Sequence, residues 1–246
     1  MVLPVPDYIE TRIRQPPPNG LPVVAGSTPV VAFGDVRKAK VATLGWNPSK
    51  LEFLDGSGNE LTGADRRLET LTSLGVSNLL SASPDVIRSV LEGCNNYVER
   101  CPYKKGFNVL DKVLCRLEAS YYTGRACHLD FVQWTTSPTW GKLQRAHKRN
   151  LIEADLPFLR QQLSQEHIRL LLLNGSGIAK AYSKMLDCEL TEKVIPGTIG
   201  LKLYLGRTLQ GARVIGWNKN LQSSFGVSND YIKAISIAIE EARLEL

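Results

Sequence analysis

The sequence predicts an α/β fold, a three-layer αβα sandwich whose central sheet has four mainly parallel strands. Four short and almost continuous apolar runs are typical of buried parallel strands, which are covered on both faces. They are Lys40–Leu44, His128–Gln133, Ile168–Leu173 and Ala212–Gly216. Segments with apolar residues at three-and-four spacing lie between and after these runs, as expected for helices that return over a sheet. They are Pro84–Leu91, Asn108–Leu117, Leu143–Leu163, Ile178–Leu186 and Asp230–Leu246.

The size and composition of the chain predict a single domain over residues 1–246. The chain has 246 residues, of which 43% are hydrophobic and 22% charged, so it can bury a sizeable core. It has no internal repeat, and no linker divides it after residue 40. The first 35 or so residues are rich in Pro and Gly. They are expected to form an irregular arm with one short strand at Val30–Phe33.

Several features bear on compartment and partners. No apolar run reaches the roughly 20 residues that a membrane helix needs, and the first residues lack the pattern of a signal peptide. Five cysteines without CxxC spacing are typical of free thiols, which predicts a cytoplasmic protein. Scattered histidines indicate no metal site. The sequence leaves the oligomeric state open, with a monomer as the working expectation.

The net charge is +6, which is compatible with nucleic acid as a partner but does not require it. Positive charge is concentrated in one short stretch, where Lys142, Arg145, His147, Lys148 and Arg149 fall within eight positions. Two interpretations stay open. The stretch is either a solvated helix face or a face on which Lys142, Arg145 and Lys148 contact phosphates.

Polar loops with aromatic residues follow the four predicted strands. Ligands of parallel sheets bind beyond the carboxyl ends of the strands, so we expect these loops to meet at one edge. Flat rings and many hydrogen-bonding groups suit a planar, polar ligand such as a nucleobase. The loops are residues 45–49 (GWNPS), 134–140 (WTTSPTW), 174–177 (NGSG) and 217–224 (WNKNLQSS).

The first of these loops, Gly45-Trp46-Asn47-Pro48-Ser49, is the most specific motif. Gly, Asn and Pro also form ordinary turns after strands, which is the alternative interpretation. The motif resembles the first motif of the uracil-DNA glycosylase superfamily, a Gly-x-Asp/Asn-Pro turn after the first core strand. The resemblance extends over roughly residues 40 to 235 as strand order and loop motifs. It implies that superfamily's fold, and an Asn47 that positions water for attack on the sugar carbon or helps to stabilise the departing base.

The resemblance also implies roles for the neighbours of Asn47. An amide orients water but cannot act as a general base, so the downstream carboxylates Glu52 and Asp55 are candidates to assist Asn47 in catalysis. Exposure of Glu52 as an ordinary loop acid is the alternative. Trp46 and Phe53 are expected to contact the base, and core packing is the alternative for Phe53. Ser49 is expected to contact DNA.

The segment Cys127–Trp134 contains an acid, Asp130, inside an otherwise apolar run. Burying a carboxylate is costly unless it is paired or used. Many members of the superfamily carry at this place an Asn that recognises uracil, and strand register aligns Asp130 with it. A carboxylate only accepts hydrogen bonds, so it matches the amino group of cytosine and repels the O4 atom of uracil. An Asp that caps backbone NH groups at a strand end is the alternative.

The loop after the fourth predicted strand lacks a residue that the superfamily usually has there. In relatives this loop begins with His, which donates a hydrogen bond to the base oxygen as negative charge develops. Matching Leu221 to the loop's leucine puts Trp217 at the His position. Trp217 or Asn218 is therefore expected to supply the donor, and Lys219 and Asn220 to contact DNA. A Trp that packs in the core at a strand end is the alternative.

These motifs together predict a DNA glycosylase that hydrolyses the N-glycosidic bond of a flipped-out, modified cytosine-type base. The expected partner is DNA, with no metal and no other cofactor. Alternatives are a uracil or mismatch glycosylase, a non-catalytic DNA-binding module of the same fold, and a small-molecule α/β enzyme. The segment that begins with the first motif is most similar to little-described prokaryotic members, some of which resemble anti-phage glycosylases that act on modified cytosine.

Overall fold

The computed structural model describes residues 4–102, 105–165, 167–196, 198, 200–222 and 227–245. The chain forms two compact units, and each unit is built from three separate stretches of sequence. The first unit comprises Met1–Phe33, Trp46–Arg100 and Leu129–Gln161. The second unit comprises Gly34–Gly45, Cys101–His128 and Gln162–Leu246.

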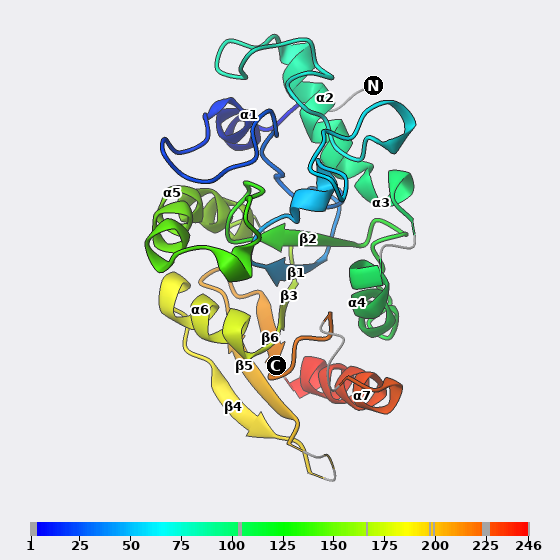
Figure 1. Ribbon diagram of the computed structural model, residues 1–246. Helices are drawn as coiled ribbons and strands as arrows, with labels where there is room; N and C mark the ends of the chain where they lie inside the picture. The colour runs from blue at the N-terminus through cyan, green and yellow to red at the C-terminus, as the bar shows by residue number, and fades with distance from the viewer. Residues whose placement is uncertain are drawn as a thin grey trace. The chain divides into compact units, whose positions relative to one another are not determined.

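The second unit holds most of a six-stranded mixed sheet with the order β2-β1-β3-β6-β5-β4 (Figure 1). β3 pairs in parallel with both β1 and β6, whereas β5 is antiparallel to both β6 and β4. All five residues of β3 are buried, as expected for a strand covered on both faces. The strands are β1 (Val41–Gly45), β2 (Ala126–Asp130), β3 (Leu170–Asn174), β4 (Thr191–Val194), β5 (Lys202–Arg207) and β6 (Arg213–Trp217).

The predicted α/β class is confirmed, but the predicted number of four strands is wrong, because the sheet has six. The two additional strands, β4 and β5, form an antiparallel pair at one end of the sheet. Strands were predicted from buried apolar runs, and β4, with the sequence TEKV, is mostly exposed. A partly solvated edge strand carries no continuous apolar run, so that criterion cannot find it.

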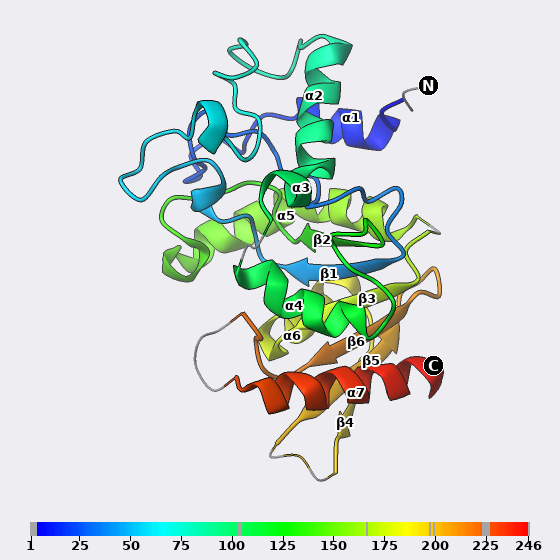
Figure 2. The same cartoon turned by 90° about the vertical axis from the view of Figure 1, so that its right-hand side faces the viewer.

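Helices cover both faces of the sheet in the second unit. α6 (Ser176–Leu186) packs against β3 and β6. α7 (Asn229–Glu245) packs against β6 and against α4 (Lys105–Cys115). α4 and α7 lie together on one face of the sheet, and α6 lies on the other (Figures 1 and 2).

The five predicted helices are confirmed with small shifts of their ends. They are α2 (Pro84–Asn95), α4, α5 (Arg145–Leu163), α6 and α7, and Leu246 lies outside the described residues. The start of α2 illustrates which residues determine where a helix begins. Ser83 Oγ accepts a hydrogen bond from Val86 N, Pro84 occupies the first turn and Asp85 places a negative charge there.

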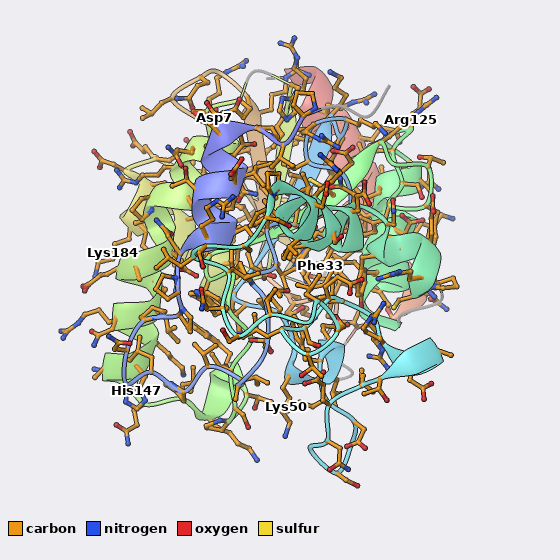
Figure 3. The ribbon with its side chains drawn as sticks, turned by 90° about the horizontal axis from the view of Figure 1, so that it is seen from above. Asp7, Phe33, Lys50, Arg125, His147 and Lys184 are labelled. Carbon is orange, nitrogen blue, oxygen red and sulfur yellow. The ribbon has the colours of Figure 1, made fainter. Side chains whose placement is uncertain are left out.

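The N-terminal segment is not an irregular arm throughout, because it contains the helix α1 (Asp7–Arg14). Ile9 and Ile13 are fully buried, and between them Arg12 is only 2% exposed. A buried arginine hides the apolar periodicity by which a helix is recognised. Val30–Phe33 is buried but is not a strand of the sheet. Phe33, which is labelled in Figure 3, packs edge-on against the ring of Tyr97. A second helix that was not predicted, α3 (Tyr97–Arg100), has only four residues.

A buried ion pair joins α1 to α5 in the first unit. Arg12 Nη2 lies 2.9 Å from Asp155 Oδ1, and neither side chain is more than 3% exposed. Gln133 completes the network, since its Oε1 accepts from Arg12 Nε and its main-chain N donates to Asp155 Oδ2. Burial lowers the pKa of Arg12 and raises the pKa of Asp155, while the attraction between the two opposes both shifts. The pair therefore holds the segment after β2 in place.

Asp155→Asn is expected to lower the free energy of unfolding by about 3–5 kcal/mol, because it leaves the Arg12 cation buried without a counter-charge. Urea denaturation followed by circular dichroism measures the loss. Glu10→Gln is the matched control, because Glu10 forms a more exposed pair with Arg14 on α1 and its removal should cost less than about 1 kcal/mol. Equal losses in the two variants would contradict the importance of the buried pair.

Candidate functional site

The predicted site residues fall into two groups, one in each unit. The residues that follow β1 and β2 belong to the first unit, and those that follow β3 and β6 belong to the second. Each group has its own hydrogen-bond network. That the groups meet in one pocket stays a prediction.

Asn47 is held by its side-chain amino group. Nδ2 donates to Trp134 O and to Thr136 Oγ1, each at 3.2 Å. A carbonyl oxygen only accepts hydrogen bonds, so the amide nitrogen must face Trp134 O, and the orientation of the amide is determined. No described residue donates a hydrogen bond to Asn47 Oδ1, and the residue is half-buried. The turn therefore presents one oriented acceptor.

Aromatic rings connect the loops that follow β1 and β2. The Trp46 ring stacks on Trp140, with centroids 5.5 Å apart and planes 18° apart, and lies 5.4 Å from the Phe131 ring. Val132 N donates to Trp46 O at 3.0 Å, which adds a main-chain bond between the same loops. Trp46 and Trp140 are half-buried, so parts of both rings are accessible to a ligand. The loops thus offer a flat apolar surface.

Glu52 is not the exposed loop acid of the alternative interpretation. It is 3% exposed, and its Oε2 accepts a hydrogen bond of 2.5 Å from Tyr97 OH and lies 3.8 Å from Arg67 Nη1. Asp55, three residues on, accepts from the main chain of Asn59 in a tight turn, and this bond is the largest cause of its lowered pKa. Glu52 is thus a buried carboxylate with defined partners. Its assistance to Asn47 stays a prediction.

The other predicted residues of the first unit differ in accessibility. Phe53 is 1% exposed, so in this structure its ring packs in the core and offers no face to a base. Asp130 is the last residue of β2 and is 5% exposed, and its recognition of a base stays a prediction. Ser49 is exposed, and its hydroxyl accepts from Leu51 N at the start of a short 3-10 helix. It remains accessible to a ligand.

The predicted basic face lies at the beginning of α5. Lys142 and Arg145 are exposed and have no ion pair with any described residue. Lys148 is half-buried, and its Nζ lies 6.0 Å from the centre of the Trp140 ring. The N-terminus of a long helix attracts anions through its free NH groups and its dipole. The positions of these three cations therefore suit contact with phosphates.

Asn174, at the end of β3, organises the loop after β6 in the second unit. Its Oδ1 accepts from Trp217 Nε1 at 3.1 Å and from Leu221 N at 2.9 Å, and its Nδ2 donates to Asn220 Oδ1 at 2.8 Å. Trp217 is fully buried. Its indole NH is thus already used, which favours the core interpretation of Trp217. This role of Asn174 is not predicted from the sequence, which shows only that a polar loop at residues 174–177 follows four leucines.

Asn218 is also used within the protein. Its Nδ2 donates to Gly200 O at 2.7 Å, and its Oδ1 accepts from Lys202 N and Tyr231 OH. Lys219 is exposed, and its Nζ lies 4.3 Å from the centre of the Tyr231 ring. Burial raises the pKa of Tyr231 to about 12. Asn220 is exposed, and residues 223–226 lie outside the described part of the chain.

Gly175 allows the loop after β6 to approach the start of α6. Its φ is 101°, in the region that favours glycine, and a Cβ there would lie 3.2 Å from Asn220 N. Ser176 N donates to Asn218 O at 3.3 Å. The turn between β3 and α6 therefore supports this loop.

Metal-dependent chemistry and cysteine nucleophiles have less support in the described residues. Among the described residues, no group of three or more His, Cys, Asp and Glu side chains is arranged to hold a metal ion. Burial raises the pKa of the Cys94 thiol to about 11 and that of Cys127 to about 12, so neither is a thiolate nucleophile at neutral pH. In the described ranges, no helix combines the length and the apolar character needed to cross a bilayer.

No protein-family model matches the chain, and no curated protein shows significant sequence similarity to it. Its function is therefore inferred from the geometry of the site and from the motifs that the site contains.

Proposed function

We propose that this chain is a DNA glycosylase with the fold of the uracil-DNA glycosylase superfamily. It hydrolyses the N-glycosidic bond of a flipped-out, cytosine-type base and leaves an abasic site. The single observation that carries the proposal is the oriented amide of Asn47, in the turn that resembles the superfamily's first motif. Both of its NH groups are used by Trp134 and Thr136, so its oxygen can accept a hydrogen bond from water.

A water molecule bound to Asn47 Oδ1 is held with a lone pair available for the sugar carbon. Attack forms the bond between the water oxygen and C1′ and breaks the C1′–N bond, whose electron pair leaves with the base. The proton lost by the water passes through solvent to the departing base. An amide cannot take up this proton, so Asn47 contributes by orientation and not as a general base.

The rest of the first unit supplies contacts for the base and for DNA. The half-buried rings of Trp46 and Trp140 provide a surface for stacking, which accepts any base. Asp130 would select the base by accepting a hydrogen bond from an exocyclic amino group. Lys142 and Arg145 would bind phosphates at the N-terminus of α5.

A non-catalytic DNA-binding module is the second candidate, and one observation favours it. The donors that could replace the missing His, the Trp217 indole NH and the Asn218 amide, are both bonded within the second unit. Abasic-site formation separates the two functions, because a binding module leaves the glycosidic bond intact.

Asn47→Ala is expected to lower the rate of base excision by roughly 100-fold or more, the contribution of one positioned catalytic group. Alkali cleavage of end-labelled DNA that contains uracil, cytosine or modified cytosine measures the rate. Thr136→Val removes one acceptor of the Asn47 amide and should give an intermediate loss, whereas Thr136→Ser keeps the hydroxyl and should stay near the parent. Unchanged excision by folded Asn47→Ala protein would exclude this role.

Asp130→Asn is expected to shift base preference from cytosine-type bases towards uracil by about ten- to a hundredfold. The reason is that an amide donates to the uracil O4 atom, which the carboxylate repels, a difference of about 1–3 kcal/mol. Excision rates of parent and variant are compared on duplexes with uracil, cytosine and cytosine modified at its fifth carbon. A parent that prefers uracil would indicate a uracil or mismatch glycosylase instead.

Replacing Lys142, Arg145 and Lys148 by Ala is expected to flatten the slope of log affinity against log salt by about one unit or more, because phosphate contacts are lost. Fluorescence anisotropy in the Asn47→Ala background measures binding without turnover. A control with Ala at Lys112, Lys180 and Lys184 removes three exposed charges from α4 and α6 and should keep the slope. Equal slopes in both triple variants would mean that the start of α5 is only solvated.

A further inference from the structure

A row of cations lies along the amino edge of the sheet in the second unit. Arg125, Lys40 and Arg169 each precede the first residue of a strand, and Arg213 is the first residue of β6. Arg207 ends the antiparallel strand β5 and pairs in register with Arg213, so it reaches the same edge. Five neighbouring strands thus contribute one cation each, in the order Arg125, Lys40, Arg169, Arg213 and Arg207.

Two cavities open along this row. One, of about 480 Å³, is lined by Lys40, Arg125, Arg169 and Arg213, and by Arg243 of α7. The other, of about 600 Å³, is lined by Arg169, Arg213 and Arg207. Because Arg169 and Arg213 line both, the cavities adjoin. Arg125 is exposed and lies at the periphery of the view in Figure 3.

The positive charge of this row is not neutralised within the described part of the chain. Neither the five cations of the row nor Arg243 forms an ion pair with a described carboxylate. Eleven ion pairs occur elsewhere in the described part of the chain. Arg125 and Arg207 donate only to main-chain oxygens, those of Glu118 and Gly211. Glu118 is the one acidic residue among the described residues that line the two cavities. Like charges on neighbouring strands repel, and a bound anion relieves that repulsion.

The dimensions of the row favour an extended anion. Neighbouring strands are about 4.8 Å apart, so cations on five strands extend over about 19 Å, which is far longer than one phosphate group. Arginine predominates, and its planar group binds phosphate oxygens in pairs. The walls also include apolar side chains, among them Leu117, Leu170 and Ile168. The sugars of a nucleic-acid backbone have apolar faces to place there, whereas an inorganic polyphosphate has none.

We propose that this row, the amino-edge row, binds the sugar–phosphate backbone of a nucleic-acid segment. Arg169 and Arg213 stand at the starts of strands whose other ends carry Asn174 and Trp217, about 17 Å and about 13 Å along the strand. The row is therefore separate from the loop after β6. It binds DNA whatever its bases, and so it adds a second DNA-binding surface to the proposed function without depending on base excision.

The test measures anisotropy of a labelled, unmodified duplex at several salt concentrations. Arg169→Gln with Arg213→Gln should reduce the slope of log affinity against log salt by about 1.8, because each lost phosphate contact removes about 0.9. Lys40→Gln with Arg125→Gln removes two other members of the row and should have the same effect, which guards against misfolding of one variant. Lys180→Gln with Lys184→Gln on α6 is the matched control and should keep the parent slope; Lys184 is labelled in Figure 3.

Two further measurements separate the row from base excision and identify the class of its ligand. Asn47→Ala should keep the parent slope, because Asn47 is not part of the row. The salt slope therefore tests the row independently of base excision. Polyglutamate and inorganic tripolyphosphate, at equal charge concentration, should displace the duplex much more weakly than unlabelled DNA does. Parent slopes in both row variants would overturn the proposal. So would displacement by polyglutamate as effective as that by DNA, which would indicate an acidic protein as the partner.

Discussion

The ion pair between Arg12 and Asp155 takes two charges out of water, and the geometry of the first unit depends on how that cost is offset. Burying two ions stabilises a fold only when hydrogen bonds satisfy their remaining groups. Here Asp155 also accepts from Gln133 N, and Arg12 also donates to Gln133 Oε1. The next residue, Trp134, supplies the carbonyl oxygen that orients the Asn47 amide. The geometry of the proposed catalytic group thus follows from a buried pair on two helices.

The chain has 30 Lys and Arg residues against 24 Asp and Glu, and cations gather on two very different surfaces. In the first unit, cations gather at the N-terminus of α5, next to aromatic rings. In the second unit, they form a row at the amino ends of the strands, and Arg predominates there. A surface with rings suits an unstacked base and its phosphates, whereas a row of arginines suits a backbone alone. The two surfaces would then contribute differently to affinity and to selectivity.

The core strands and the amphipathic helices could be predicted, because burial on both faces leaves a continuous apolar run and burial on one face leaves a periodic one. Features that depend on a distant partner could not be predicted in this way. Glu52 is buried because Tyr97, 45 residues away, donates to it, and Trp217 is satisfied by Asn174, 43 residues away. Likewise Arg12 is buried against Asp155, 143 residues away, with Gln133 as its second partner. Motif spacing can place such residues in loops, but it cannot show which groups already have partners.

Release of a free base is the most direct measure of the central claim. The protein is incubated in excess with a duplex that contains cytosine modified at its fifth carbon, and small molecules are analysed by mass spectrometry. Hydrolysis of the glycosidic bond predicts the intact modified base in solution, in an amount equal to the abasic sites that appear in the DNA. The claim would be contradicted if the protein bound the duplexes but released no base from any of them, whether they contained a cytosine-type base, uracil or a mismatch.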